Sequence, residues 1–111
     1  MYKLYAVWTS PSPGEEEAFE RHYTEVHLPL AAAIPGVRKV VATRTSNSLG
    51  GGASALHRIT ELWFEDHAAM EAAEASPEGA ATIKDAVEIQ ERFGAALTSV
   101  AGSAAEPPLG A

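Results

Sequence analysis

Apolar residues form short runs in four parts of the chain, and these runs predict β-strands. The runs are rich in branched and aromatic side chains and lie between turn-forming residues, which is typical of strands. They cover residues 3–9, 37–45, 56–64 and 96–101. The first run is apolar on both faces, with Trp8 on one and Tyr5 on the other. Since a sheet with one face in water would alternate with polar residues, we expect both faces of this sheet to be covered.

Apolar residues at steps of three and four predict a first helix after the first strand. Ser12-Pro13-Gly14-Glu15 fits a capping box, with Ser12 as N-cap, and Pro35-Gly36 should end the helix. Its predicted apolar face is Phe19, Tyr23, Val26, Leu30, Ala33 and Ile34. Pro29 removes one helical hydrogen bond, so we expect a kink or a loosened turn beside His27.

Two more helices are predicted after the third strand. Asp66 is the expected N-cap of an alanine-rich helix at residues 67–75. Ser76-Pro77 should start another helix that runs to about Phe93, since serine followed by proline is a common helix start. Its predicted inner face contains Ile83 and Val87, with Ala86 and Gln90 as further candidates. Residues 47–54 form a glycine-rich link without the spacing of a phosphate-binding loop.

The order of these elements is β-α-β-β-α-β, which predicts an α+β, ferredoxin-like fold with a four-stranded antiparallel sheet. Both helical segments would cover one face of the sheet and leave the other, apolar face bare. An exposed apolar face of that size favours association, so we expect a homodimer through the sheet faces, which forms a dimeric α+β barrel. Residues 1–101 would form the domain, and the proline-rich residues 102–111 a disordered tail.

Composition narrows the possible partners. The formal charge of −7, from 15 acidic and 8 basic residues, argues against a nucleic-acid partner. No apolar run reaches about 18 residues, so no membrane span is expected, and the first residues are too short and strand-like for a signal peptide. The absence of cysteine excludes disulfides, thiolate metal sites and a cysteine nucleophile. We therefore expect a cytoplasmic protein.

His27 is the main candidate for acid–base chemistry. It lies at one edge of the predicted apolar face, and an unperturbed imidazole pKa of about 6.5 suits proton transfer near neutral pH. Tyr23, four residues earlier, could orient His27 or donate a hydrogen bond to a substrate oxygen. The alternative is a structural histidine that bonds a backbone carbonyl freed by Pro29.

Glu61, Trp63 and Trp8 are candidates for ligand binding. Strand alternation places Glu61 and Trp63 on one face together with His57 and Ile59. If that face meets the helices, Glu61 could share a pocket with His27. If it meets a second subunit, Glu61 would pair across strands or subunits with an arginine at position 38, 44 or 58. Both tryptophans are otherwise core or interface aromatics.

Metal and cofactor sites are not expected. His22 and His27 are five residues apart, whereas ligands on one side of an α-helix are four apart. His57 and His67 lie elsewhere without a ligand spacing. A heme would find only His27 as an axial ligand, with no further support in the sequence.

Several motifs together resemble the EthD family, named for a protein of ethyl tert-butyl ether degradation. They are Phe19-x-x-x-Tyr23-x-x-x-His27-x-Pro29-Leu30, Pro35-Gly36-Val37, Glu61-Leu62-Trp63-Phe64, and Ser76-Pro77-Glu78 leading to Asp85. The resemblance implies a dimeric α+β barrel, with His27 at the motif histidine and Tyr23 one turn before it. Relatives with that fold include cofactor-free monooxygenases, isomerases, cyclases and decarboxylases, and also accessory proteins without an assigned reaction.

The resulting hypothesis is a homodimer that binds a small hydrophobic compound, aromatic or lactone-like, in a cleft between sheet and helices. His27 and Tyr23 would carry out cofactor-independent proton transfer or oxygenation there. The alternative is a non-catalytic accessory or ligand-binding protein of a catabolic or biosynthetic pathway, in which His27 is structural.

Overall fold

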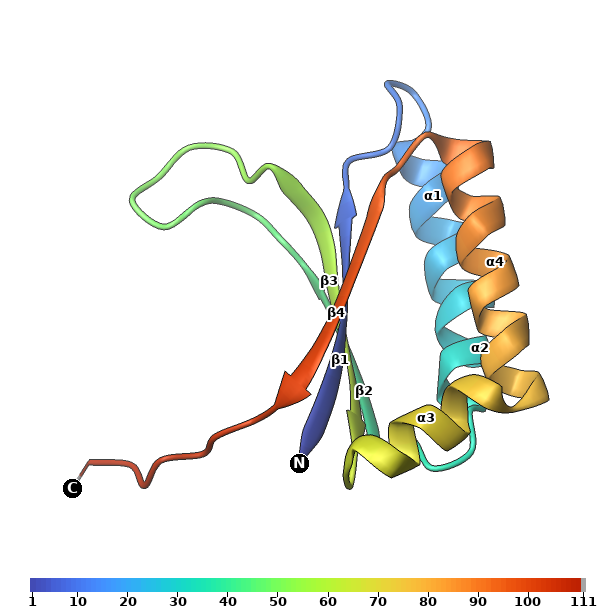
Figure 1. The fold of residues 1–111 in the computed structure, drawn as a ribbon. Coiled ribbons are helices and arrows are strands. Elements are labelled where there is room, and N and C mark those ends of the chain that lie inside the picture. The colour runs from blue at the N-terminus through green and yellow to red at the C-terminus, as the bar shows by residue number, and fades with distance from the viewer. Residues whose placement is uncertain (111) are drawn as a thin grey trace.

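The computed structural model describes residues 1–110 and places all helices on one face of a four-stranded antiparallel sheet (Figure 1). The strands are β1 (Tyr2–Thr9), β2 (Lys39–Arg44), β3 (Leu56–Phe64) and β4 (Leu97–Ser103), in the order β2-β3-β1-β4. The helical segments are α1 (Glu16–His22), η1 (Tyr23–His27), α2 (Leu28–Ala32), α3 (His67–Ala75) and α4 (Pro77–Phe93). This confirms the predicted ferredoxin-like α+β fold. Strand β4 extends two residues beyond the expected end of the domain, and Ala111 of the predicted tail lies outside the described residues.

The predicted capping box at the first helix is wrong. Helix α1 begins at Glu16, its N-cap is Glu15, and no side chain caps it. Gly14 has a φ of +87°, a left-handed conformation that cannot continue into a right-handed helix. Residues 12–15 instead form a turn in which the Glu15 N–H donates to the Ser12 carbonyl at 2.9 Å.

The loosened turn expected beside His27 is a π-helical turn, η1, closed by the Leu28 N–H donating to the Tyr23 carbonyl. One residue is in effect added to the helix, so the apolar face after Tyr23 shifts by one position. His27, Ala31 and Ile34 are buried, whereas Val26 is 41% exposed. The predicted face was therefore correct before the π-turn and one residue out of register through most of the helix after it.

Helices α3 and α4 begin as predicted. The Asp66 carboxylate accepts a hydrogen bond from the Ala69 N–H at 2.8 Å, and the Ser76 hydroxyl accepts one from the Gly79 N–H at 3.0 Å. The inner face of α4 was predicted correctly only at Ala86, which is buried, because Ile83 and Val87 are exposed. The buried side of α4 is formed by Asp85, Ala86, Ile89 and Phe93.

Strand β3 contains an irregularity that reverses one predicted orientation. The register between β1 and β3 shifts after Trp8 pairs with Arg58, because Thr9 pairs with Leu56 and leaves His57 without its own partner. A β-bulge of this kind breaks the alternation of side chains. His57 therefore packs against Phe19 of α1 at 5.0 Å between ring centroids instead of lying with Glu61 and Trp63.

The helix-facing side of the sheet carries the core, and its other side is bare. Trp8, Phe19 and Tyr23 pack with Ile89 and Phe93 between sheet and helices. Within residues 1–110 no helix covers the opposite face, on which the β2–β3 loop and the C-terminal residues project (Figure 1). The apolar side chains of this bare face are Tyr5, Val7, Val41, Ile59, Trp63 and Val100. None of the helices in the described part of the chain has the length and apolar character needed to cross a membrane.

Candidate functional site

A single buried carboxylate joins two histidines at the centre of the helical layer. Asp85 of α4 lies 2.8 Å from His27 through its Oδ2 and 3.0 Å from His22 through its Oδ1, measured to Nδ1 and Nε2 of the two rings. On a regular α-helix, residues five apart point about 140° away from each other. The π-turn between them has i→i+5 hydrogen bonds, so both rings reach the same partner.

The environment of His27 favours its neutral form. The residue is 6% exposed, and burial lowers the pKa of His27 because it penalises the charged ring. The Asp85 carboxylate acts in the opposite direction and His22 in the same direction. An ionised carboxylate only accepts hydrogen bonds, so the proton of His27 lies on Nδ1 and points at Asp85. The lone pair on Nε2 remains available to accept a proton.

Tyr23 holds the ring of His27 in place. The two rings are stacked with centroids 5.2 Å apart, and the Trp8 ring lies in a T-shaped arrangement with that of His27, at 6.1 Å between centroids. The Tyr23 hydroxyl is hydrogen-bonded to that of Thr60 on β3. Burial raises the pKa of Tyr23, and the hydrogen bond with Thr60 opposes this effect only in part. Tyr23 is therefore an uncharged phenol that positions its neighbours.

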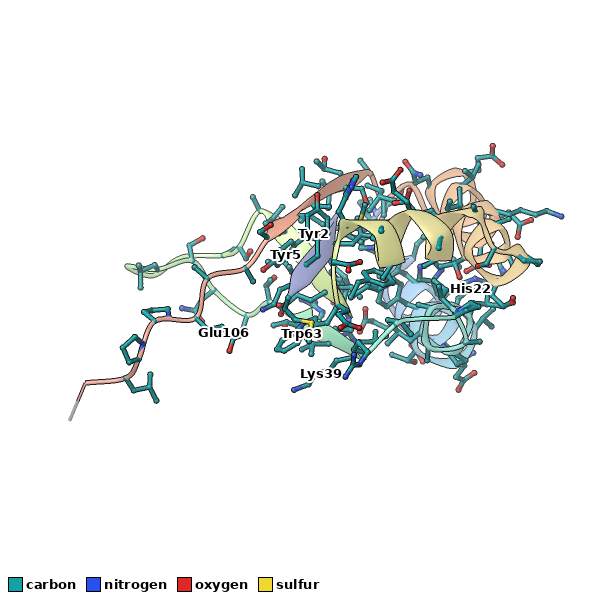
Figure 2. The ribbon with its side chains drawn as sticks, turned by 60° about the horizontal axis from the view of Figure 1, so that its bottom comes forward. Tyr2, Tyr5, His22, Lys39, Trp63 and Glu106 are labelled. Atoms are coloured by element: carbon teal, nitrogen blue, oxygen red, sulfur yellow. The ribbon has the colours of Figure 1, made fainter. Side chains whose placement is uncertain are left out.

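The other sequence-predicted site residues are divided between the two faces of the sheet. Trp8 is fully buried beside His27. Glu61 and Trp63 lie on the bare face, where Lys3 contacts both of them: its Nζ is 3.4 Å from the Glu61 carboxylate and 3.9 Å from the Trp63 ring centroid. Figure 2 shows Trp63 and Lys39 near each other at the sheet and His22 among the helices. The structure thus brings Trp8 and Tyr23 to His27 and does not bring Glu61 or Trp63 there.

Sequence reasoning missed Asp85, His22 and Thr60 as parts of the site. Asp85 stood in the family motif without a role, and that motif was the signal available in the sequence, because the predicted inner face of α4 did not include Asp85. His22 was set aside because its spacing from His27 does not fit an α-helix, a test that a π-turn invalidates. Thr60 gave no signal in the sequence, because only the fold brings its hydroxyl to that of Tyr23.

A second buried polar cluster lies next to Tyr23, on the side of α1. Glu20 accepts hydrogen bonds from Arg58 at 2.5 Å and from His57 at 3.0 Å. Burial tends to raise the pKa of Glu20, but these hydrogen bonds and positive charges outweigh burial and lower it. The bulge in β3 makes this arrangement possible because it turns His57 toward the helices, where Arg58 already lies through the regular alternation of the strand. The cluster fixes the position of Arg58 over the Tyr23 ring, 5.6 Å from its centroid.

A cavity of about 500 Å³ lies between α4 and the sheet. Most of its wall is apolar, including Leu4, Leu62, Ala86 and Leu97, and Thr82, Ser99 and Gln90 add polar atoms. His27 and Tyr23 are not among the described residues that line it. Ala86 and Leu97, however, also pack against the cluster of Trp8 and Tyr23, so the cavity and the His27–Asp85 pair share this part of the core.

No group of three histidine, cysteine or acidic side chains within residues 1–110 is arranged to hold a metal ion. The two histidines contact Asp85 as hydrogen-bond partners. An imidazole oriented in this way can transfer a proton, and an apolar cavity lies nearby.

Comparisons with known proteins give the family of the chain. Residues 13–89 match the model of the EthD domain. An uncharacterized 11.0 kDa protein from the thcB-thcC intergenic region of Rhodococcus erythropolis is 35% identical over 79 residues, 71% of this chain and 74% of the relative. A crystal structure of an EthD family protein from Bacillus halodurans has 32% identity and a TM-score of 0.82, over 95% of this chain and 99% of the other.

More distant structures agree in fold. SnoaB from Streptomyces nogalater, a cofactor-independent oxygenase, has 16% identity and a TM-score of 0.65, with 96% of this chain and 94% of SnoaB covered. At that identity the likeness concerns the architecture and not the reaction. The match of the family model to residues 13–89, together with the two relatives above 30% identity, shows that the chain belongs to the EthD family.

Proposed function

We propose that this protein binds a small, uncharged hydrophobic compound in the cavity between α4 and the sheet. A volume of about 500 Å³ lies in the usual range for small-molecule sites, which are mostly apolar with a few polar groups. No lysine or arginine lines the cavity among the described residues, and Glu74 is its charged side chain. A ligand carboxylate would therefore find no cationic partner there, so the site suits neutral aromatic or lactone-like molecules.

We further propose that His27 acts as a general base or acid on this compound, without a cofactor. The observation that carries this proposal is the buried His27–Asp85 pair, in which the carboxylate holds the Nδ1 proton and leaves Nε2 free to accept one. After Nε2 accepts a proton, Asp85 would stabilise the imidazolium. Isomerisation and cyclisation of a neutral compound require such a transfer, and an oxygenation can begin with one, whereas decarboxylation would bring a carboxylate into a cavity without a cationic partner.

A second candidate function is ligand binding without catalysis, as an accessory protein of a pathway. It is favoured by one observation, that His27 and Tyr23 are not among the described residues on the cavity wall. For proton transfer the ligand must reach past Ala86 and Leu97 toward His27. In the accessory role the cavity alone would be functional. For either function, the cytoplasmic location stays a prediction from composition.

Binding should appear as thermal stabilisation by a neutral hydrophobic probe, because a ligand of the folded form raises the free energy of unfolding by mass action. At a hundredfold excess over its Kd the probe would add about 2.7 kcal/mol. We would titrate 2-naphthol and coumarin against wild type and against Ser99→Leu, which fills the cavity from β4. Ala81→Leu, on the exposed side of α4, is the matched control.

We expect wild type and Ala81→Leu to bind one of these probes or a related neutral compound, and Ser99→Leu to lose it. Equal binding by all three proteins would place the ligand elsewhere. His27→Gln then separates the two functions. If His27 is the acid–base group, this variant still binds but loses turnover of a ligand that the wild type converts.

We also propose that a second copy of the chain covers the bare face of the sheet. Its six apolar side chains come from all four strands, with the Lys3–Glu61 pair among them, and large apolar surfaces mark association sites. The indole nitrogen of Trp63 is buried there without a hydrogen-bond partner among residues 1–110. The β2–β3 loop and the C-terminal residues project on the same side (Figure 1), so they would flank the second copy.

Sedimentation equilibrium should therefore show a particle of two chains for the wild type. Ile59→Glu places a charge at the centre of the bare face and should weaken the dimer by at least about 100-fold, a cost of about 2.7 kcal/mol. Val26→Glu, on the exposed side of the helical layer and not on the cavity wall, is the matched control and should leave the dimer intact. A wild type that sediments as a single chain at all concentrations would exclude this partner.

A further inference from the structure

The carboxylate of Asp85 has a second imidazole partner that the proposed proton transfer does not use. His22 Nε2 lies 3.0 Å from Oδ1 and 3.1 Å from Oδ2, and His27 Nδ1 lies 2.8 Å from Oδ2. Both oxygens of Asp85 are thus occupied by histidine. One contact with Asp85 would be enough to give the buried His27 ring its hydrogen bond, so the contact of His22 calls for a separate explanation.

The two rings differ in their access to solvent. The His22 side chain is 17% exposed and that of His27 is 7% exposed. His27 is enclosed by Tyr23, Trp8 and Asp85, whereas His22 lies at the start of the π-turn beside Phe93, at 5.7 Å between ring centroids. His22 is therefore the outer member of the trio and His27 the inner one.

Few groups can influence the charge of His27. Asp85 faces it from α4, His22 from α1, Tyr23 from its own turn and Trp8 from β1. Tyr23 is uncharged at neutral pH because burial raises the pKa of its phenol, and Trp8 does not titrate. Among the described residues in contact with this ring, Asp85 is the one carboxylate, and His22 competes with His27 for it.

We propose that His22 is a positioning residue that keeps His27 neutral and ready to accept a proton, by sharing the carboxylate of Asp85. One carboxylate balances the charge of one imidazolium. A proton on His22 neutralises Asp85 and leaves a second proton on His27 without a counter-charge in a buried position. The inference deepens the proposed acid–base role of His27 and rests on it for its functional meaning.

The direct test is an NMR titration of the four imidazole rings in the free protein. His22→Gln removes the titrating ring but keeps an amide N–H that can donate to Asp85. We expect the pKa of His27 to be higher in this variant than in wild type, because the repulsion from His22 is lost and no second imidazolium shares the negative charge of the carboxylate. His67→Gln is the matched control, since His67 pairs with Glu71 on the exposed side of α3 and should leave His27 unchanged.

A double-mutant cycle then asks whether the effect passes through Asp85. In an Asp85→Asn background the substitution His22→Gln should move the pKa of His27 less than it does in the wild type. If His22→Gln does not fold, as judged by its amide spectrum, His22→Asn replaces it in the same cycle. An unchanged or lower pKa of His27, or an equal shift with and without the carboxylate, would overturn the proposal.

This experiment needs no ligand, so its result is independent of the probe titration. If no compound binds the cavity but the cycle shows the expected coupling, the proposed function fails and the role of His22 remains. If a ligand is turned over but the pKa of His27 does not respond to His22, the present inference alone fails.

Discussion

Replacing Trp8 with alanine should lower the free energy of unfolding by about 3–5 kcal/mol, the usual cost of truncating a buried aromatic side chain. Trp8 is 0% exposed and lies edge-on to Phe19, Tyr23 and His27, at 5.9–6.1 Å between ring centroids. Its removal would leave a hole beneath the π-turn and would also release the His27 ring. Urea denaturation monitored by circular dichroism measures the loss.

Trp63→Ala is the matched control for Trp8→Ala. Trp63 lies on the bare face under the amines of Lys3 and Lys39, at 3.9 and 4.8 Å from its ring centroid. At protein concentrations low enough to dissociate a dimer, Trp63→Ala should therefore cost much less stability than Trp8→Ala. If Trp8→Ala kept its stability and lost only probe binding, Trp8 would be a ligand-binding residue, as the sequence also allowed.

Replacing Gly79 with alanine should destabilise the protein by about 1–3 kcal/mol, the usual cost of inserting an atom into packed surroundings. A Cβ at this position collides with the carbonyl oxygen of Ala73 and lies 3.0 Å from that of Glu74. Both are backbone atoms at the end of α3, so the junction of α3 and α4 must open to admit the methyl group. Thermal and urea denaturation should both show the loss.

Gly102→Ala provides the comparison for Gly79→Ala. A Cβ at Gly102 in β4 meets open space, and its φ is not in the left-handed region. We expect that substitution to be close to neutral. A similar, near-neutral effect of both substitutions would contradict this prediction, since it would show that the junction of α3 and α4 admits the methyl group; the entropy of the unfolded chain favours alanine at both positions. Because Gly79 also lines the cavity, its variant should be included in the probe titration.

The proposals place catalysis and association on opposite faces of one sheet. The His27–Asp85 pair and the cavity lie under the helices, whereas Glu61 and Trp63 lie on the face that a second copy would cover. Variants of Glu61 and Trp63 should therefore change assembly before they change ligand binding. The position of Glu61 agrees with the alternative that placed it away from His27, but the predicted arginine partner is wrong: Glu61 pairs with Lys3, and the three arginines pair with other carboxylates.

The sequence by itself determined the class of fold and most element boundaries, because the signals for them are local. Asp66 and Ser76 begin their helices through hydrogen bonds within three residues, so a short segment contains all that is needed. Apolar alternation likewise predicted a strand at Leu56–Phe64 with the bounds that the structure has. Gly14 was the local signal that was misjudged, because its positive φ prevents the helix from starting at Ser12 and so rules out the expected capping box.

Only the tertiary structure decided which side chains meet. The π-turn shifts the first helix by one residue and brings His22 and His27 to one carboxylate, while the bulge in β3 turns His57 toward Glu20. A single inserted residue leaves the apolar pattern almost unchanged, yet it redirects most later side chains of the first helix and reverses His57 in β3. Asp85 lies 58 residues from His27 in the chain, and contacts across that distance depend on how α4 packs against the first helix, which no local pattern specifies.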